Sequence, residues 1–233
     1  MSSTIQTFSI SSANDNAIVM SNSTWARPIT LNSNWNQVRL GMRVQFINVT
    51  GGLVGTPRFA FGLCHGTTNL VGDTSTDNFV GWVTTSANWT WNGPGAGSVF
   101  FSNTIAPATR VGTTLTTGTA FSADWRIGAN GSAGAFRMGM YLDITKGSPN
   151  YTLKLWGALG IPGTAQDLSA SSFLTSMTAA TPTLFGVTSA IGSSNQTIAV
   201  DEGANGTLNA INCWWNQSVV TPILSDIAIA VLS

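Results

Sequence analysis

A thiol and an imidazole stand side by side in the stretch FAFGLCHG, where Cys64 precedes the only histidine of the chain, His65. A thiol nucleophile needs a base within hydrogen-bond reach and a further group that orients the base. Phe59, Phe61 and Leu63 alternate with smaller residues, which predicts a strand, and adjacent strand residues point to opposite faces. We therefore expect Cys64 and His65 to lie apart at a strand end, and we predict no catalytic residue.

Ligands for a metal ion are sparse. Two cysteines and one histidine supply at most three soft ligands, without the paired spacing of structural zinc. The segment DTSTDN places Asp73, Ser75 and Asp77 at the spacing of the first ligands of a calcium loop. However, Asn78 stands where that loop needs glycine, and Thr84 stands where it needs a bidentate glutamate. The segment is interpreted as a polar turn, and neither a metal nor another cofactor is predicted.

Glycoside hydrolysis requires two carboxylates that flank the scissile bond. Asp124 and Asp143 lie in strand-like segments and could line one concave face, which keeps a glycosidase as an alternative. The single glutamate, Glu202, follows Asp201 at the start of a glycine-rich turn, where solvated side chains are expected. The main prediction is a protein that is not an enzyme.

Tryptophans cluster at two places in the sequence. In GWVTTSANWTWNGPG, Trp89 and Trp91 share a strand face by parity and lie close to Asn92. This set could stack on a sugar ring and hydrogen-bond its hydroxyls, so Trp89, Trp91 and Asn92 are the predicted glycan-binding residues. The interpretation we favour over this glycan site is that these rings are buried in the core or in a subunit interface, where large rings bury the most area. Trp214 and Trp215 point to opposite strand faces, so at least one of them must be buried.

Apolar residues recur with a period of two, which predicts strands that position these side chains. In RLGMRVQFI, one face carries Leu40, Met42, Val44 and Phe46, and FRMGMYLDIT repeats the pattern. In YTLKLW the inward residues are Tyr151, Leu153 and Leu155, and in DIAIAVL the alanines of the second face predict close packing there. Further strands are predicted at 5–10, 59–64, 79–83, 98–102, 121–127, 183–187, 197–200 and 213–220.

Glycine- and proline-rich turns separate these segments, which predicts an all-β fold: an antiparallel two-sheet β-sandwich of jelly-roll type with at most one short helix. The helix is expected in TAQDLSASSFLTSMTAA, with an apolar face of Leu168, Phe173, Leu174 and Met177. We expect residues 1–24 to form an N-terminal arm that pairs with a neighbouring subunit, and residues 25–233 to form a single β-sandwich domain.

The charge balance narrows the possible partners. Charged residues make up 8% of the chain, against roughly 25% in an ordinary soluble domain. Nine Lys and Arg balance nine Asp and Glu, so there is no basic stripe for nucleic acid. No stretch approaches the roughly 20 apolar residues of a membrane span, and the first residues lack a secretory signal. A near-zero net charge favours self-association, and Cys64 and Cys213 are expected to be buried thiols rather than a bridge.

The neutral strands, rich in Ser, Thr, Asn and Gly, resemble those of bacteriophage virion proteins, especially tail-fibre, receptor-binding and capsid-decorating components. In the C-terminal half, GMYLDITKG, YTLKLWGA and LSDIAIAVLS are similar in layout to concanavalin A-like or laminin G-like jelly rolls, in which a late strand often carries an aspartate, as Asp226 does here. The usual metal-binding acidic residues of lectins are not identifiable in this sequence, so the resemblance does not imply lectin activity.

The first resemblance implies a structural component exposed on the exterior of a virus particle and assembled in the host cytoplasm. Its partners would be other copies of the chain and other virion proteins. The alternative function is a carbohydrate-binding module, or a receptor-binding tip, that recognises host-surface glycans.

Overall fold

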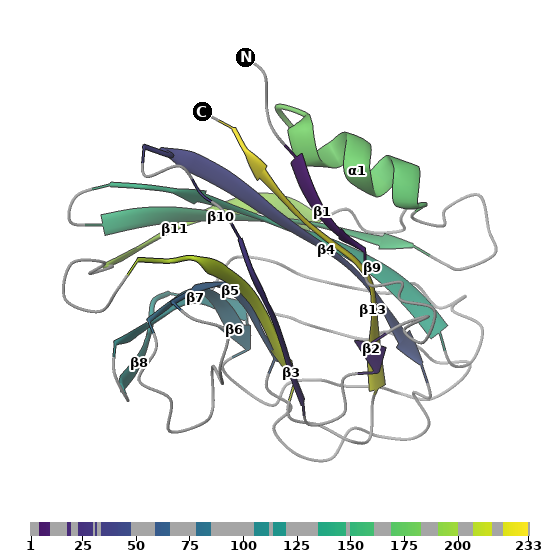
Figure 1. The fold of residues 1–233 in the computed structure, drawn as a ribbon, viewed down its shortest axis with the longest axis horizontal. Helices are drawn as coiled ribbons and strands as arrows, with labels where there is room; N and C mark the ends of the chain where they lie inside the picture. Colours follow the sequence, from purple (N-terminus) through teal and green to yellow (C-terminus); the bar gives the residue numbers. More distant parts are fainter. Residues whose placement is uncertain are drawn as a thin grey trace.

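Two antiparallel sheets stacked face to face make up the structure, a computed structural model (Figure 1). It describes residues 5–9, 18–19, 23–29, 31, 34–47, 59–65, 78–84, 105–111, 114–119, 135–147, 150–160, 169–182, 191–199, 207–215 and 221–232. The seven-stranded sheet has the order β1-β13-β4-β9-β10-β11, with β2 also paired to β13. Its strands are β1 (Ile5–Ser9), β2 (Ile18–Val19), β4 (Gln37–Ile47), β9 (Ala135–Thr145), β10 (Asn150–Gly160), β11 (Ile191–Ala199) and β13 (Thr221–Val231).

The six-stranded sheet has the order β3-β12-β5-β6-β7-β8. Its strands are β3 (Ser23–Pro28), β5 (Phe59–Cys64), β6 (Phe79–Thr84), β7 (Ile105–Val111), β8 (Thr114–Thr117) and β12 (Ala210–Trp215). Strands from the two ends of the chain pair in both sheets, β1 with β13 and β3 with β12, as a jelly roll requires. The predicted fold class is confirmed.

Most strands with clear alternation lie where the sequence predicts them, including β4, β5, β6, β9, β10 and β13. The strands β2, β3, β7 and β8 are not predicted, and β11 begins six residues before the predicted 197–200. The predicted strands 98–102, 121–127 and 183–187 lie outside the described residues.

The N-terminal segment adds a pairing that the sequence does not predict. In the structure β1 pairs with β13 of the same chain over five residues, and Ile5 packs against the cluster beneath α1. Residues 5–9 are therefore part of the sheet of their own chain, rather than bound to a neighbour. The division of the chain at residue 24 stays a prediction.

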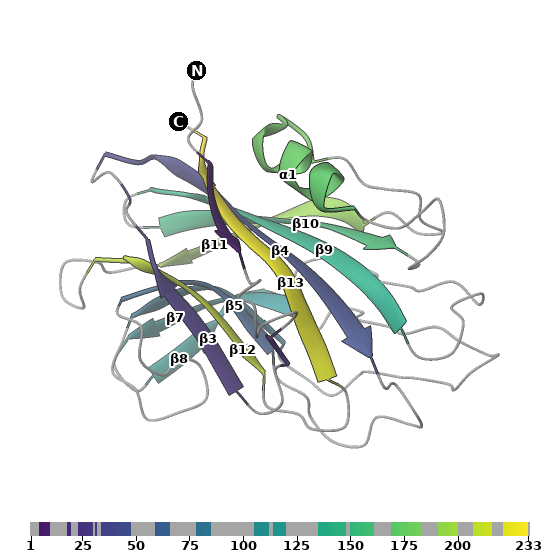
Figure 2. The ribbon, with the colours of Figure 1, turned by 45° about the vertical axis from the view of Figure 1, so that its right-hand side comes forward.

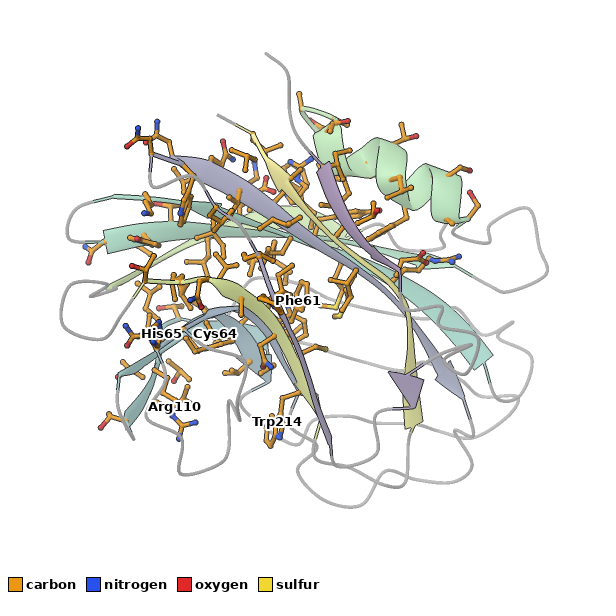
Figure 3. All side chains as sticks on the ribbon, in the orientation of Figure 1. Phe61, Cys64, His65, Arg110 and Trp214 are labelled. Carbon is orange, nitrogen blue, oxygen red and sulfur yellow. The ribbon has the colours of Figure 1, made fainter. Side chains whose placement is uncertain are left out.

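The core between the sheets follows the period-two pattern. Leu40 and Met42 of β4, Leu142 of β9 and Leu153 of β10 are fully buried, as predicted. The six-stranded sheet contributes Phe61, which points between the sheets in Figure 3. Phe61 and Trp82 meet edge to face, with ring centroids 6.4 Å apart. Val44 and Phe46, also predicted for this face, are outside the side chains that the structure describes.

The helix α1 (Ala170–Thr178) covers β13 and β4 on the side of the seven-stranded sheet that faces away from the other sheet (Figures 1 and 2). Ser169 caps its N-terminus by accepting a hydrogen bond from the backbone N–H of Ser172. Beneath the helix lies a second apolar cluster, which confirms the close packing expected of the β13 alanines: Tyr141, Trp156, Phe173, Met177, Ala228 and Ala230.

The prediction for the buried face of the helix is wrong at one residue. Leu174 is exposed, whereas Phe173, Ser176 and Met177 are buried. These three residues occupy the i, i+3 and i+4 positions of one helix stripe, and Leu174 falls beside that stripe. Leu168 lies outside the described residues.

Candidate functional site

The most prominent candidate residue, Trp214, lies on the outer face of the six-stranded sheet. This is the face turned away from the seven-stranded sheet. It carries a buried cluster of Ala60, Cys64, Phe79, Val83, Ala108 and Ala210, with Trp214 partly buried against it. Trp214 points away from the space between the sheets, and Arg110 lies on the same face near the other end of the strands (Figure 3). Asn212 lies two residues before Trp214 on this face and is fully buried.

Small residues bring the strands of this face close together. A Cβ atom at Gly62 would lie 2.3 Å from the carbonyl oxygen of Val80 and 2.6 Å from the Cα of Gly81. The ring of Phe79 lies over both glycines, 2.9 Å from the Cβ position of Gly62. This arrangement of an aromatic ring over paired strand glycines replaces the packing that their missing side chains would have given.

The connection between β6 and β7, which contains the predicted glycan-binding residues, leaves the sheet at the same end as Trp214, two strands away from it. Register places Trp214 opposite Ala60, and Ala60 opposite Val83 near the end of β6. The next residue, Thr84, pairs with Ile105 of β7, so residues 85–104 connect two adjacent strands from this end of the sheet. Hairpin loops have about two to five residues, and much longer connections often carry binding residues.

Trp89, Trp91 and Asn92 belong to this connection and lie outside the described residues, so their role stays a prediction. Because β12 pairs with β5 and β5 pairs with β6, Trp214 lies at the end of the sheet where the 85–104 connection begins. Sequence reasoning identified Trp214 as part of a pair but did not single it out. Its parity relative to Cys213 was the available signal.

Three other tryptophans are core side chains. Trp35, Trp82 and Trp156 are all buried. Trp35 meets Tyr151 edge to face with ring centroids 6.1 Å apart.

The neighbouring thiol and imidazole do not form a catalytic pair. The Cys64 Sγ lies on the outer face and donates to the carbonyl oxygen of Ala210 at 3.6 Å. The His65 Nδ1 lies 3.0 Å from the carbonyl oxygen of Thr207, beyond the end of β5. The prediction that Cys64 and His65 lie apart at a strand end is confirmed.

Asp143 is the one residue of the candidate carboxylate pair that the structure describes. Its carboxylate takes part in a buried ion pair. Its carboxylate accepts from Arg39 at both oxygens, with Nε–Oδ1 at 2.5 Å and Nη2–Oδ2 at 2.8 Å. The indole N–H of Trp156 also donates to Oδ2, at 2.9 Å. Asp143 is 4% exposed and lies on the α1 side of the molecule, away from the outer face that carries Trp214. Asp124 lies outside the described residues.

Arg39 completes this cluster by reaching the end of α1. Its Nη1 donates to the carbonyl oxygens of Ser176 at 2.8 Å and Ala179 at 2.6 Å. Carbonyls in the last turn of a helix have no partner within the helix, and the helix dipole favours a cation there. The Arg39–Asp143 pair therefore joins β4, β9 and α1.

The remaining candidates give no metal centre in the described part of the chain. Asp226 pairs with Arg43, and no group of three or more His, Cys, Asp or Glu side chains comes together among the described residues. Asp73, Ser75 and Asp77 lie outside those residues. Cys64 and Cys213 are buried thiols that form no disulfide, as predicted, and burial raises the pKa of the Cys213 thiol.

No helix in the described ranges is long and apolar enough to span a membrane. No family model matches the sequence, and no curated protein matches it. Solved structures of lectins share the general form. Peanut lectin with a nine-residue peptide has 9% identity and a TM-score of 0.44, over 99% of this chain and 97% of that chain.

Two further structures are similar in the same way. The metal-free carbohydrate recognition domain of Emp46p has 11% identity and a TM-score of 0.41, over 97% of this chain and 87% of that chain. Arcelin-5, a lectin-like defence protein from Phaseolus vulgaris, has 7% identity and a TM-score of 0.31, over 98% of this chain and 91% of that chain. This likeness is one of overall sandwich form alone.

Proposed function

We propose that this chain is a non-catalytic carbohydrate-binding protein whose glycan site lies at the Trp214 end of the outer face. The observation that carries the proposal is the placement of Trp214, a partly buried aromatic side chain on the outer face, at the end of the sheet where the connection with Trp89, Trp91 and Asn92 begins, two strands away. An indole ring offers an apolar face to a sugar ring and an N–H to its hydroxyls. Neutral amides and hydroxyls are abundant in the chain and suit an uncharged glycan.

The proposal that the protein is not an enzyme has separate support. In the part of the chain that the structure describes, the carboxylates are those of Asp143 and Asp226, and each forms an ion pair with an arginine. Paired carboxylates for glycoside hydrolysis stand about 5 to 10 Å apart around a substrate. The Asp143 carboxylate is enclosed by Arg39 and Trp156 instead.

The test is a glycan array probed with the wild-type protein, followed by titration of any glycan that binds. W214A and the double variant W89A/W91A should each weaken binding at least about tenfold, which corresponds to about 1.4 kcal/mol. W214F keeps an apolar ring on the cluster and should retain part of the affinity if W214A fails to fold. L174A is the matched control, since Leu174 is an exposed apolar residue on α1, on the opposite side of the sandwich.

Two results would overturn the glycan proposal. One is a wild-type protein that binds no glycan on the array. The other is a bound glycan whose affinity is the same in W214A, W89A/W91A and L174A.

A second candidate function is a structural component on the exterior of a virus particle, assembled in the host cytoplasm with other virion proteins. The specific observation in its favour is an open, uncharged sheet edge at β8, in a chain of balanced charge. Exposed edges of this kind pair readily with other chains. Assemblies much larger than a dimer, such as tubes, rings or sheets in electron micrographs, would favour this candidate over a free lectin.

A further inference from the structure

The edge strand β8 ends the six-stranded sheet and is exposed along its whole length. It pairs with β7 on one side, with Leu115 opposite Arg110 and Thr117 opposite Ala108. Leu115 is 37% exposed and is one of two large apolar residues of the described chain with this much exposure. An apolar side chain on an open edge makes this strand a candidate for pairing with another chain.

The hydrogen-bond pattern decides which groups of β8 point outward. Gly118 donates its N–H to the carbonyl oxygen of Pro107 at 2.8 Å, so Gly118 bonds toward β7. Bonded positions alternate along an antiparallel strand, which turns Thr114 and Thr116 toward β7 as well. The N–H and C=O groups of Leu115 and Thr117 therefore point away from β7, and β7 is the one strand that β8 pairs with among the described residues.

β8 also lacks the features that normally protect an edge strand. Natural proteins place lysine, proline or an inward charge on exposed edges, or cover them with another segment. The four residues of β8, Thr-Leu-Thr-Thr, carry no charge and no proline, and all four are exposed. An edge of this composition favours pairing over isolation in water.

The sequence around β8 identifies the partner. Residues 112–118 read GTTLTTG, the same in both directions about Leu115. We propose that two copies of this chain pair β8 with β8 about a two-fold axis at Leu115, which joins their six-stranded sheets into one continuous sheet. In this register Thr114 faces the partner's Thr116, and Leu115 faces the partner's Leu115.

The outward groups match this arrangement. Leu115 meets the partner's Leu115 as a hydrogen-bonded pair, in which each residue donates one N–H and accepts at one C=O. Cross-strand Thr–Thr pairs and apolar pairs both stabilise antiparallel strands. The net formal charge of zero removes long-range repulsion between the two copies.

This pairing goes beyond glycan binding and does not depend on it. Leu115 shares the outer face with Arg110 and Phe79, because the register aligns all three across β8, β7 and β6. The two copies would therefore present their Trp214 residues on the same side of the joined sheet. A surface that carries several glycans could then be held at two points by one dimer.

The first test uses a charge at the proposed axis. In L115K, the two introduced lysines would face each other directly, so association should weaken at least about tenfold. L174K is a matched control, because Leu174 is also 37% exposed but lies on α1. L115E should be monomeric too, and a mixture of L115K and L115E should restore the dimer. The measurement is the mass by light scattering over a series of concentrations.

The second test traps the pair. Opposed residues in a hydrogen-bonded antiparallel pair have Cα atoms about 5.5 Å apart, which lies within disulfide range. L115C should therefore form a covalent dimer on mild oxidation, whereas L174C should stay mostly monomeric. The native thiols Cys64 and Cys213 are buried and should not compete.

Three results would overturn the pairing. The first is a wild-type protein that stays monomeric at high concentration while L115C cross-links no faster than L174C. The second is an oligomer whose mass does not change in L115K. The third is a mixture of L115K and L115E that does not associate. Titrating L115K with glycan separates the two proposals, since a monomer that still binds glycan leaves the glycan site intact.

Discussion

Arg39 is the residue whose loss should affect the fold most clearly. It is 1% exposed, and its guanidinium bonds to Asp143 and to two carbonyls at the end of α1. R39M leaves the Asp143 carboxylate buried without its cation, which typically costs about 3–5 kcal/mol of stability. D143N should be comparably harmful because it leaves the guanidinium without its anion.

The comparison is with Arg43, which pairs with the partly exposed Asp226. Water screens this second pair, so R43M should lower the free energy of unfolding by about 1 kcal/mol or less. Urea unfolding of the three variants and the wild type measures both effects. Equal losses in R39M and R43M would contradict the structural role assigned to Arg39.

Tyr141 makes the free energy of unfolding depend on pH in the alkaline range. Burial beneath α1 raises the pKa of Tyr141 to about 12 from 10.0. Between these values the unfolded chain releases the phenol proton while the folded chain keeps it, so the free energy of unfolding falls as pH rises. The fall should amount to roughly 2–3 kcal/mol across this interval.

Y141F should remove this part of the pH dependence and leave the shape of the profile at neutral pH as it is in the wild type. Burial also raises the pKa of Cys213, whose ordinary value is 9.0, so its thiol acts in the same direction. The two contributions separate when C213A is compared with C213A/Y141F. Identical alkaline profiles for that pair would contradict the assignment to Tyr141.

At the scale of elements, α1 packs on the sheet because Gly41 leaves room for it. A Cβ at Gly41 would lie 2.3 Å from the Sδ of Met177 and 2.9 Å from the ring of Phe173. The methionine can move, but the buried ring has little freedom, so G41A should cost about 1–3 kcal/mol. The near-ultraviolet spectrum should change with it, because Tyr141 and Trp156 lie in the same cluster.

The control for G41A is T152A, at an exposed position of β10 in the same sheet. The near-ultraviolet spectrum and the free energy of unfolding should change in G41A and stay at the wild-type values in T152A. An unchanged spectrum and stability in G41A would mean that Met177 and Phe173 of the helix do not pack against Gly41.

Strands could be predicted from the sequence where apolar and polar side chains alternate. They could not be predicted where the strand is defined by its pairing with a neighbouring strand and shows no alternation. β4, β9 and β10 carry long alternating runs, since each has one face in the core. β7 contains Pro107, which usually argues against a strand. That proline is tolerated because its carbonyl still accepts from Gly118 while its missing N–H removes only one bond to β8. β11, with the sequence IGSSNQTIA, is a strand because it pairs along β10.

At the scale of the whole molecule, the sequence predicted the sandwich but not which candidates meet. Trp214 and the 85–104 connection are more than a hundred residues apart in sequence, and only the pairing of β12 with β5 and β5 with β6 brings them together. The role of Arg39 was equally hidden, because alternation alone places it on the face opposite Leu40 without revealing the helix that covers that face. Sheet order carries information that local periodicity lacks.

The meeting of the two chain ends has a consequence for how this protein can be attached to something larger. Ile5 pairs with Ala230, and both Ile5 and Leu232 pack against the cluster beneath α1. Figures 1 and 2 show the start of β1 and the end of β13 side by side at one end of the seven-stranded sheet. A polypeptide or a solid support joined to either end would therefore be anchored at the same corner. Trp214 and the edge of β8 belong to the other sheet, so a tethered sandwich would turn them toward the surroundings.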